Sequence, residues 1–247
     1  MKRWLWIALM LAIVLVIVVA TFPARLALSG VLAQESTIRL EGVAGTVWNG
    51  SAARVLHRDE DQGRLHWRLR AMPLLLGRII ANVQLEGPQL RGSARVSRRG
   101  ELLRVGSARL EIPARHLESL LDIPALHPTG TLHLELHELE LQGRVPMALE
   151  GRVIWRDAGM SGAAQADFGT LEASFGALPG GGFGGELRDQ GGPLSLEGRF
   201  RTTVLGYEAE AHLRARDDDP QVTRALRHIG QIQPDGSVLF RVKGGLG

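Results

Sequence analysis

Two kinds of side chain in this sequence could carry out chemistry, namely eight histidines and several closely spaced carboxylates. His133 and His137 are four residues apart, a spacing that lets two histidines on one helix face bind the same metal ion. They lie, however, in a stretch with strand-like alternation, where four residues span about 13 Å. That is too far for two ligands of one zinc ion unless the chain bends there. The pattern therefore favours solvent-facing histidines, and we expect no metal site.

The carboxylates are also better explained by structure than by catalysis. Glu135, Glu138 and Glu140 could suggest an acid–base pair, but they alternate with leucines, which is typical of the solvated face of a strand. The acidic run 217–219 stands directly before Pro220, and this order is typical of a helix N-terminus. Helix capping explains the run without a bound cation.

Motifs for nucleotide binding and nucleophilic catalysis are weak or missing. Gly180, Gly182 and Gly185 satisfy GxGxxG, but no helical pattern follows them, as a dinucleotide site requires. The sequence has no GxxxxGK[ST], no GxSxG and no cysteine. It therefore excludes a P-loop, a thiol nucleophile, a thiolate zinc site and a disulfide scaffold. We predict a protein that is not an enzyme and has no cofactor.

The elements that position these side chains are predicted to be β-strands. Beyond residue 22 the dominant hydrophobic period is two, the pattern of antiparallel strands with one buried face. A one-residue slip at His137-Glu138 predicts a β-bulge. We expect a mostly β fold with a curved antiparallel sheet. The clearest alternating runs are residues 65–69, 132–141, 145–155, 194–200, 207–213 and 238–242.

Two short helices interrupt this pattern, at residues 114–121 and 220–229, each with apolar side chains on one face. Each is followed by a Pro-x-Gly sequence, 128–130 and 234–236, and then by an alternating strand, at a constant offset of 106 residues. Proline and glycine at this spacing predict a turn in both places. An internal duplication and the chance recurrence of a common turn both explain this echo.

Residues 177–193 are rich in glycine. Such a composition is typical of a flexible loop between strands. The segment is also a candidate boundary between two parts of the domain.

The N-terminal segment predicts a membrane anchor. Residues 4–22 contain no charge, glycine or proline, and as a helix they would be about 28 Å long, close to the thickness of a bilayer core. A cleaved signal peptide is the alternative, although its hydrophobic region is usually shorter. Both interpretations place the rest of the chain outside the cytoplasm. The residues that flank the anchor are Lys2, Arg3, Trp4, Trp6 and Arg25.

The positive charges of Lys2 and Arg3 predict a cytoplasmic N-terminus. We therefore predict a cytoplasmic tail at residues 1–3, a transmembrane anchor at 4–22 and a periplasmic β-rich domain at 23–247. The protein would be a single-pass protein of the inner membrane. The net charge is only +3, and no basic patch with interleaved aromatic residues is present, so nucleic-acid binding is not expected.

A glycine-rich block at residues 40–52 combines turn residues with apolar bulk. Gly42, Gly45 and Gly50 permit tight turns or close approach of two backbones. Thr46 and Trp48 stand between them, and Trp48 would close the end of the sheet nearest the membrane. Two interpretations stay open, a hairpin with a core tryptophan and a docking surface for a partner.

The order of these segments resembles a known family. The sequence Phe22-Pro23-Ala24-Arg25-Leu26 at the anchor exit, followed by G-x-x-G-T-x-W-x-G-x-A from residue 42, is similar to the type II secretion system protein N family, also called general secretion pathway protein N. The later sequence Pro73-Leu74-Leu75-Leu76-Gly77 is similar in kind. The resemblance runs nearly from end to end of the chain.

The resemblance implies a non-enzymatic inner-membrane component of the machine that exports folded proteins across the outer membrane. It implies as partners the inner-membrane platform and the outer-membrane secretin, with no cofactor. The family also looks distantly related to AsmA-like β-groove proteins, which handle lipids at the envelope. This relation supplies a second hypothesis, a periplasmic protein that binds or transfers lipid on an apolar sheet face.

Overall fold

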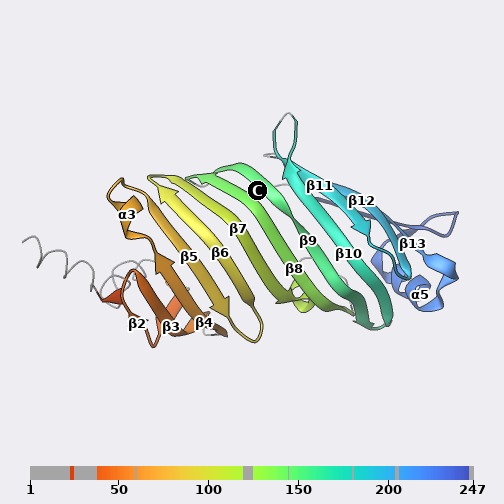
Figure 1. Ribbon diagram of the computed structural model, residues 1–247. Coiled ribbons are helices and arrows are strands. Elements are labelled where there is room, and N and C mark those ends of the chain that lie inside the picture. Colours follow the sequence, from red (N-terminus) through yellow and green to blue (C-terminus); the bar gives the residue numbers. More distant parts are fainter. Residues whose placement is uncertain are drawn as a thin grey trace, which may run out of the picture. The chain divides into compact units, whose positions relative to one another are not determined.

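The computed structural model describes residues 23–24, 38–58, 60–118, 125–143, 145–179, 181–203 and 206–244. The strands follow one another along the chain, as the colours of Figure 1 show. The chain divides into two compact units, residues 1–100 and 101–247. Both consist mainly of antiparallel strands, which confirms the predicted mostly β fold. The predicted anchor lies outside the described residues. Among the residues that are described, no helix has the length and apolar character needed to cross a membrane.

The first unit is an antiparallel sheet whose strands follow the order β1-β3-β4-β5-β6, with β2 paired to β3. The short helix α3 interrupts the connection between β4 and β5. Its elements are β1 (Ile38–Glu41), β2 (Ala44–Gly45), β3 (Asn49–His57), β4 (Glu60–Leu69), α3 (Ala71–Leu74), β5 (Ile79–Glu86) and β6 (Arg91–Arg99).

The register of the first unit explains its hydrophobic pattern. Trp67 on β4 lies opposite Gly50 on β3 and Val83 on β5, so these residues share one face. The next residue along β4, Arg68, lies opposite Asn49 and Asn82 on the other face. The alternation in residues 65–69 therefore belongs to a strand with one apolar and one polar side, as predicted.

The second unit is an open sheet with the strand order β7-β8-β9-β10-β11-β12-β13-β15-β14. Every pair within it is antiparallel, and sequence neighbours are spatial neighbours except at β14 and β15. Its elements are β7 (Leu102–Pro113), η1 (Ala114–Leu117), β8 (Leu126–Gln142), β9 (Val145–Gly162), β10 (Ala166–Ala177), β11 (Phe183–Asp189), β12 (Leu194–Thr203), β13 (Gly206–Ala215), η2 (Arg216–Asp218), α5 (Pro220–Ile229), β14 (Gln231–Ile232) and β15 (Val238–Gly244).

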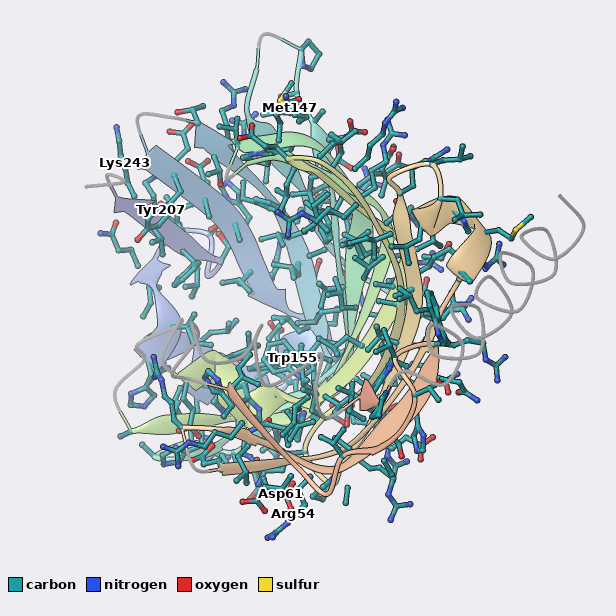
Figure 2. All side chains as sticks on the ribbon, turned by 90° about the vertical axis from the view of Figure 1, so that its left-hand side faces the viewer. Arg54, Asp61, Met147, Trp155, Tyr207 and Lys243 are labelled. Carbon is teal, nitrogen blue, oxygen red and sulfur yellow. The ribbon has the colours of Figure 1, made fainter. Side chains whose placement is uncertain are left out.

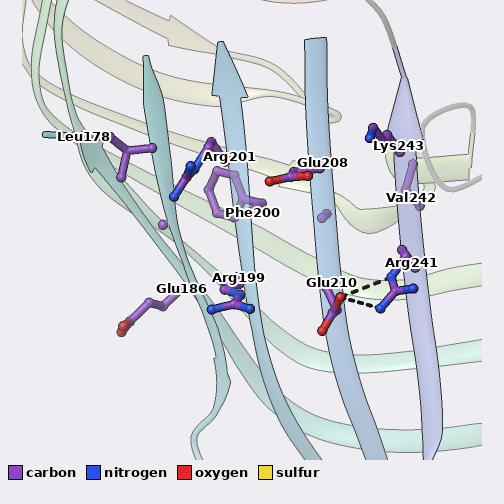
Figure 3. A pocket seen from close by; sticks show the side chains of 12 residues that line it. Leu178, Glu186, Arg199, Phe200, Arg201, Glu208, Glu210, Arg241, Val242 and Lys243 are labelled. Atoms are coloured by element: carbon purple, nitrogen blue, oxygen red, sulfur yellow. Dashed lines mark hydrogen bonds and ion pairs between the residues drawn. The ribbon is translucent and has the colours of Figure 1, made fainter. Parts of the chain in front are cut away.

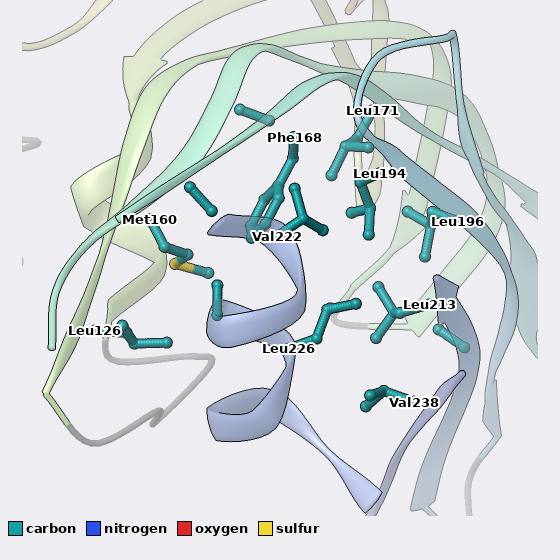
Figure 4. Close-up of a cluster of buried hydrophobic side chains, with 14 residues drawn as sticks. Leu126, Met160, Phe168, Leu171, Leu194, Leu196, Leu213, Val222, Leu226 and Val238 are labelled. Atoms are coloured by element: carbon teal, nitrogen blue, oxygen red, sulfur yellow. The ribbon is translucent and has the colours of Figure 1, made fainter. Parts of the chain in front are cut away.

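Helix α5 closes the core of the second unit, and its bounds match the prediction. Asp219 caps it, because its Oδ1 accepts hydrogen bonds from the backbone N–H groups of Gln221 and Val222, at 2.8 and 3.0 Å. Val222 and Leu226 are buried and point from α5 towards Phe168 and the apolar side chains of the neighbouring strands (Figure 4). The acidic run therefore begins a helix, as the sequence indicates.

The predicted β-bulge is confirmed. Between Leu136 and Glu138 the register of β8 against β9 shifts by one residue, so His137 is the extra residue on β8. The shift explains why leucine spacing in this strand changes from two to three and back to two.

Of the two turns predicted at Pro-x-Gly segments, one is not present in the structure. Residues 128–130 do not form a turn, because they lie inside β8, where Pro128 pairs with Met160 and Thr129 with Gly159. Gly130 has a positive φ of 94° and stands where the register of β8 against β9 shifts. This glycine therefore allows a bulge within the strand. Only the second Pro-x-Gly, with Gly236 at φ 81°, forms a turn. The two echoed segments thus differ in backbone conformation.

The helix predicted at residues 114–121 begins at Ala114, as a 3-10 turn, and residues 119–121 lie outside the described part. The glycine-rich segment 177–193 is not one loop, because it contains β11, which pairs with β10 and β12. It lies within the second unit, and the division of the chain falls between Gly100 and Glu101. Helix α3, which is only four residues long, was not predicted.

Candidate functional site

The glycine-rich block forms the β2–β3 hairpin. The backbone N–H of Thr46 donates to the carbonyl oxygen of Asn49 at 3.0 Å, and the N–H of Asn49 donates to Thr46 Oγ1 at 3.2 Å. Gly42 and Gly45 have positive φ angles of 64° and 84°, which other residues adopt only with strain. The hairpin interpretation of this block is therefore confirmed.

Trp67 packs against this hairpin, and Trp67 and Trp48 are both half-buried. A Cβ added to Gly50 would lie 2.4 Å from Cζ2 of Trp67, so the indole ring lies directly over the glycine. The indole N–H of Trp67 also donates to the carbonyl oxygen of Val47 at 3.1 Å. A core tryptophan at position 48 was one of the two open interpretations, and the side chain there is not fully buried. Sequence reasoning missed the role of Trp67 because it depends on which strands pair.

The segment after the predicted anchor joins the same hairpin. Pro23 forms an isolated antiparallel bridge with Thr46, and Ala24 is fully buried. A third segment also contacts the hairpin. The backbone N–H of Leu69 donates to the carbonyl oxygen of Trp48 at 2.7 Å, so the end of β4 and the start of α3 lie beside the hairpin. The structure therefore gathers three segments that are distant in sequence at one end of the first unit.

A second candidate surface is the apolar face of the sheet in the second unit. Its central row crosses eight strands, and each member lies opposite the next. The phenylalanines of this row alternate with glycines or alanine, and the ring of Phe175 lies over Gly151. The members of this phenylalanine row are Ala108, Leu136, Gly151, Phe175, Gly185, Phe200, Ala209 and Val242.

Helix α5 covers only part of this apolar face. It packs on the end of the face that contains Leu171, Leu213 and Val238, which are buried. Phe175 and Phe200 stand four residues further along their strands, about 13 Å away, and are half-buried outside the core cluster. The phenylalanine row therefore lies outside the core that α5 closes.

The opposite face carries alternating charges. One row across eight strands reads Arg, Glu, Arg, Ser, Glu, Arg, Glu, Arg, and its members are Arg109, Glu135, Arg152, Ser174, Glu186, Arg199, Glu210 and Arg241. Two of its neighbouring pairs are ion pairs, Glu135 with Arg152 at 2.6 Å and Glu210 with Arg241 at 2.7 Å. These hydrogen bonds from arginine lower the pKa values of both glutamates.

This charged row borders an open groove of about 490 Å³ over β11, β12, β13 and β15, in which Arg241 and Glu210 form the bonded pair (Figure 3). Side chains of both signs line it, including Arg199, Glu208 and Lys243. Exposed charges point away from their strands, as Lys243 does, and Arg54 and Asp61 do so in the first unit (Figure 2). The mixture of signs gives the groove no strong preference for an anion or a cation.

A further polar cluster is structural. Asp189 Oδ1 accepts hydrogen bonds from Arg216 Nη2 at 2.6 Å and from the N–H of Gly191 at 3.1 Å, while Oδ2 accepts from the N–H of Leu196 at 2.8 Å. Burial alone would raise the pKa of Asp189, but these three donors outweigh it and the pKa is lowered. The cluster joins the end of β11, the start of β12 and η2.

The residues first considered for chemistry do not converge. His133 lies opposite Ile154 and Glu111, and His137 is the bulge residue. Among the described residues, no three histidines, aspartates or glutamates lie close enough together to hold a metal ion. What the structure does offer is one hairpin end and two extended sheet faces.

Comparison with known proteins decides the family. The model of the family described as "Type II secretion system (T2SS), protein N" matches residues 36–241, from just before β1 into β15. The chain belongs to the type II secretion system protein N family. The type II secretion system protein N of Vibrio cholerae serotype O1 is 29% identical over 264 aligned positions, which cover 100% of both chains. No solved structure gives a significant match to this chain.

The protein N match confirms the predicted family and includes most of the surfaces described above. The hairpin with Thr46, helix α3, the charged row and all of the phenylalanine row except Val242 fall within residues 36–241. As a member of the protein N family, the chain is a component of the type II secretion system. Pro23 and the predicted anchor precede the matched region.

Proposed function

We propose that this chain is a non-enzymatic scaffold of the type II secretion system. In this proposal residues 4–22 anchor it in the inner membrane, and both units lie in the periplasm. The bridge between Pro23 and Thr46 is the observation that carries the proposal.

That bridge ties the anchor directly to the folded domain. Pro23 follows the last apolar residue of the predicted anchor, Phe22, without a linker. A helix that ends at Phe22 would therefore hold the Thr46 hairpin at the membrane surface. The positive charges at Lys2 and Arg3 favour an orientation with the N-terminus in the cytoplasm, which puts the hairpin on the periplasmic side.

The surfaces support a scaffold role because they are extended faces with balanced charge. Two arginine–glutamate ion pairs bridge neighbouring strands in this row, and the mixture of signs leaves a surface without a strong field. Such a face fits contacts with other proteins of the machine, for which the inner-membrane platform and the secretin are the proposed partners. Support for the system itself comes from the family match.

The orientation can be tested with an alkaline phosphatase reporter fused after Gly247, which is active only outside the cytoplasm. We expect high activity for the natural chain and reduced activity for the double variant Lys2→Glu, Arg3→Glu, because positive residues favour the cytoplasmic side. The matched control is Arg91→Glu, Lys243→Glu, which changes charge equally at exposed positions far along the chain. Low activity of the natural chain would contradict the orientation, and equally high activity in all three proteins would contradict the role of Lys2 and Arg3 in setting it.

A lipid-binding role is the second candidate, and the partly covered phenylalanine row favours it. Phe175 and Phe200 are half-buried, and Tyr207, two residues before Ala209 on β13, is 43% exposed. The row could contact acyl chains, as the distant likeness to AsmA-like proteins implies. Mass spectrometry of lipids that copurify with the chain tests this role. Lipid lost in a Phe200→Ser variant but kept in a Tyr207→Ser variant would place it on the row.

A further inference from the structure

We propose that the tip formed by α3 and the residues after it inserts into the outer layer of the same membrane that holds the anchor. The partner that this tip binds is thus a lipid bilayer with anionic headgroups. The inference rests on the proposed function, because it requires the anchor to place this end of the first unit at the membrane.

The tip exposes large apolar side chains that nothing in the described residues covers. Met72, Leu75 and Leu76 are 78%, 83% and 76% exposed, and Leu74 and Ile79 beside them are also exposed. Single exposed leucines are common on protein surfaces, but a contiguous group at the point of a structure usually marks an interaction site. We call Met72, Leu75 and Leu76 the apolar tip.

The apolar tip is held in place by its backbone. The N–H groups of Leu75 and Leu76 donate to the carbonyl oxygens of Met72 and Pro73, at 3.2 and 3.0 Å, and the N–H of Gly77 donates to Leu74. Gly77, with a positive φ of 67°, lets the chain turn back into β5. The leucines are therefore presented on a defined turn, which reduces the entropy lost when they bind.

The tip lies close to the end of the predicted anchor, and this position favours lipid as its binding partner. Leu69, just before α3, bonds to Trp48, and Trp48 lies in the turn of the hairpin that bridges Pro23 through Thr46. All three segments lie at one end of the strands of the first unit. If the anchor ends at Phe22, the tip lies at the level of the membrane surface.

The charges around the tip fit an anionic headgroup layer. Residues 67–82 and 95–100 contain no carboxylate. Glu86, which follows the first range, lies at the far end of β5, and Glu101 directly follows the second range. Arginine side chains can bury their apolar stems and keep their guanidinium groups at phosphate level, where anionic lipid attracts them. Five exposed arginines surround the tip at this end, Arg68, Arg70, Arg78, Arg98 and Arg99.

The test uses the cysteine-free chain, because one introduced cysteine is then the only thiol. Full-length Leu75→Cys, labelled with an environment-sensitive fluorophore, is reconstituted into vesicles of phosphatidylethanolamine and phosphatidylglycerol. We expect nitroxide groups on the lipid chains to quench this label several-fold more strongly than a label at Gln89→Cys. Gln89 is exposed in the loop at the opposite end of the same unit.

A third position separates failure of the tip from failure of the anchor. A label at Ile13→Cys, in the predicted anchor, should be quenched by lipid nitroxide whether or not the tip inserts. Quenching at position 13 without quenching at position 75 would overturn the inference and leave the anchor intact. Quenching at neither position would overturn both proposals.

A sequence change completes the test. Replacing Leu75 and Leu76 with serine should reduce quenching of a label at Met72→Cys to the level at Gln89, because the insertion depends on apolar bulk. The matched control Val145→Ser, Met147→Ser alters two exposed apolar residues of the second unit and should leave it unchanged. A tip label that is shielded only in native membranes, and not in the vesicles, would assign the tip to a protein partner and overturn the inference.

Discussion

Pro23 and Thr46 pair as an antiparallel bridge, although they are 23 positions apart in the sequence. Pro23 belongs to the segment at the exit of the predicted anchor, and Thr46 to the hairpin turn. The two parts of the sequence that carry the family resemblance are therefore in contact. The bridge therefore joins the turn-forming block to the segment that follows the predicted anchor.

A spacer tests whether direct attachment matters. We predict that about ten Gly-Ser residues inserted between Phe22 and Pro23 abolish secretion, because they allow up to about 33 Å between membrane and hairpin. The fold should survive, since the Pro23 bridge is kept. The control is the same spacer between Pro88 and Gln89, an exposed loop, and it should be tolerated. Full secretion with the anchor spacer would show that the attachment is not needed.

The contact between Gly50 and Trp67 predicts a sharp cost for a small change. We expect Gly50→Ala to lower the free energy of unfolding by roughly 1–3 kcal/mol, because the new methyl group overlaps the indole ring. Gly106→Ala, in β7, is the matched control, since a Cβ there meets nothing within 4 Å. Denaturant unfolding of both variants measures the difference. Similar values for the two would mean that the ring moves aside freely.

Helix α5 should depend on its cap as well as on its core. We predict that Asp219→Ala lowers the stability of the second unit by about 0.5–2 kcal/mol, because two backbone donors lose their acceptor. Leu226→Ala should lower the free energy of unfolding more, by about 2–5 kcal/mol, since Leu226 lies on the buried face of the helix. Thermal unfolding gives the ranking. Asp218→Asn, next to the cap, should have little effect, because asparagine also tolerates the positive φ of 51° at this position. A loss as large as that of Asp219→Ala would contradict the assignment.

The Asp189 cluster predicts a dependence of stability on pH. Its pKa is lowered in the folded protein, so its stabilising contribution is present above the ordinary pKa of an aspartate and is lost as the pH falls through the folded value. We expect Asp189→Asn to destabilise the second unit by roughly 1–3 kcal/mol at neutral pH, because charge-assisted bonds are lost.

The difference between natural chain and Asp189→Asn should shrink below about pH 4, where aspartates become protonated. Urea unfolding of both proteins at several pH values measures it. Asp167→Asn is a useful control, since among the described residues its carboxylate accepts the N–H of Gly169 and is bonded to no arginine. A difference that stays constant down to acid pH would show that the charge of Asp189 contributes nothing.

The strands could be predicted where one face is apolar along their whole length. Residues 194–200 and 207–213 alternate cleanly because each strand presents one side to the core and one to solvent. β6 and β11 contain few large apolar residues, and β11 lies within a glycine-rich stretch, so the same rule missed them. Helix α5 combined a cap, a proline and an apolar face, and its bounds followed from these signals.

The hairpin end was only partly predictable, because its contacts join distant segments. The glycines indicated a turn, but nothing local showed that Trp67 lies over Gly50 or that Pro23 reaches Thr46. The turn expected at residues 128–130 failed for a related reason, since pairing with β9 holds Pro128 and Thr129 in a strand. Helix α3 gave no periodic signal because it is a single turn with exposed leucines.

The most direct test of the scaffold role is cross-linking in living cells, with photoreactive residues at Thr46, Phe200 and Arg241, followed by mass spectrometry of the products. These positions sample the hairpin, the phenylalanine row and the charged row. We predict that the secretin or inner-membrane platform proteins are recovered from at least one of them. Recovery of phospholipid or lipopolysaccharide from Phe200, with no secretion protein from any position, would contradict the scaffold and favour a lipid-binding role.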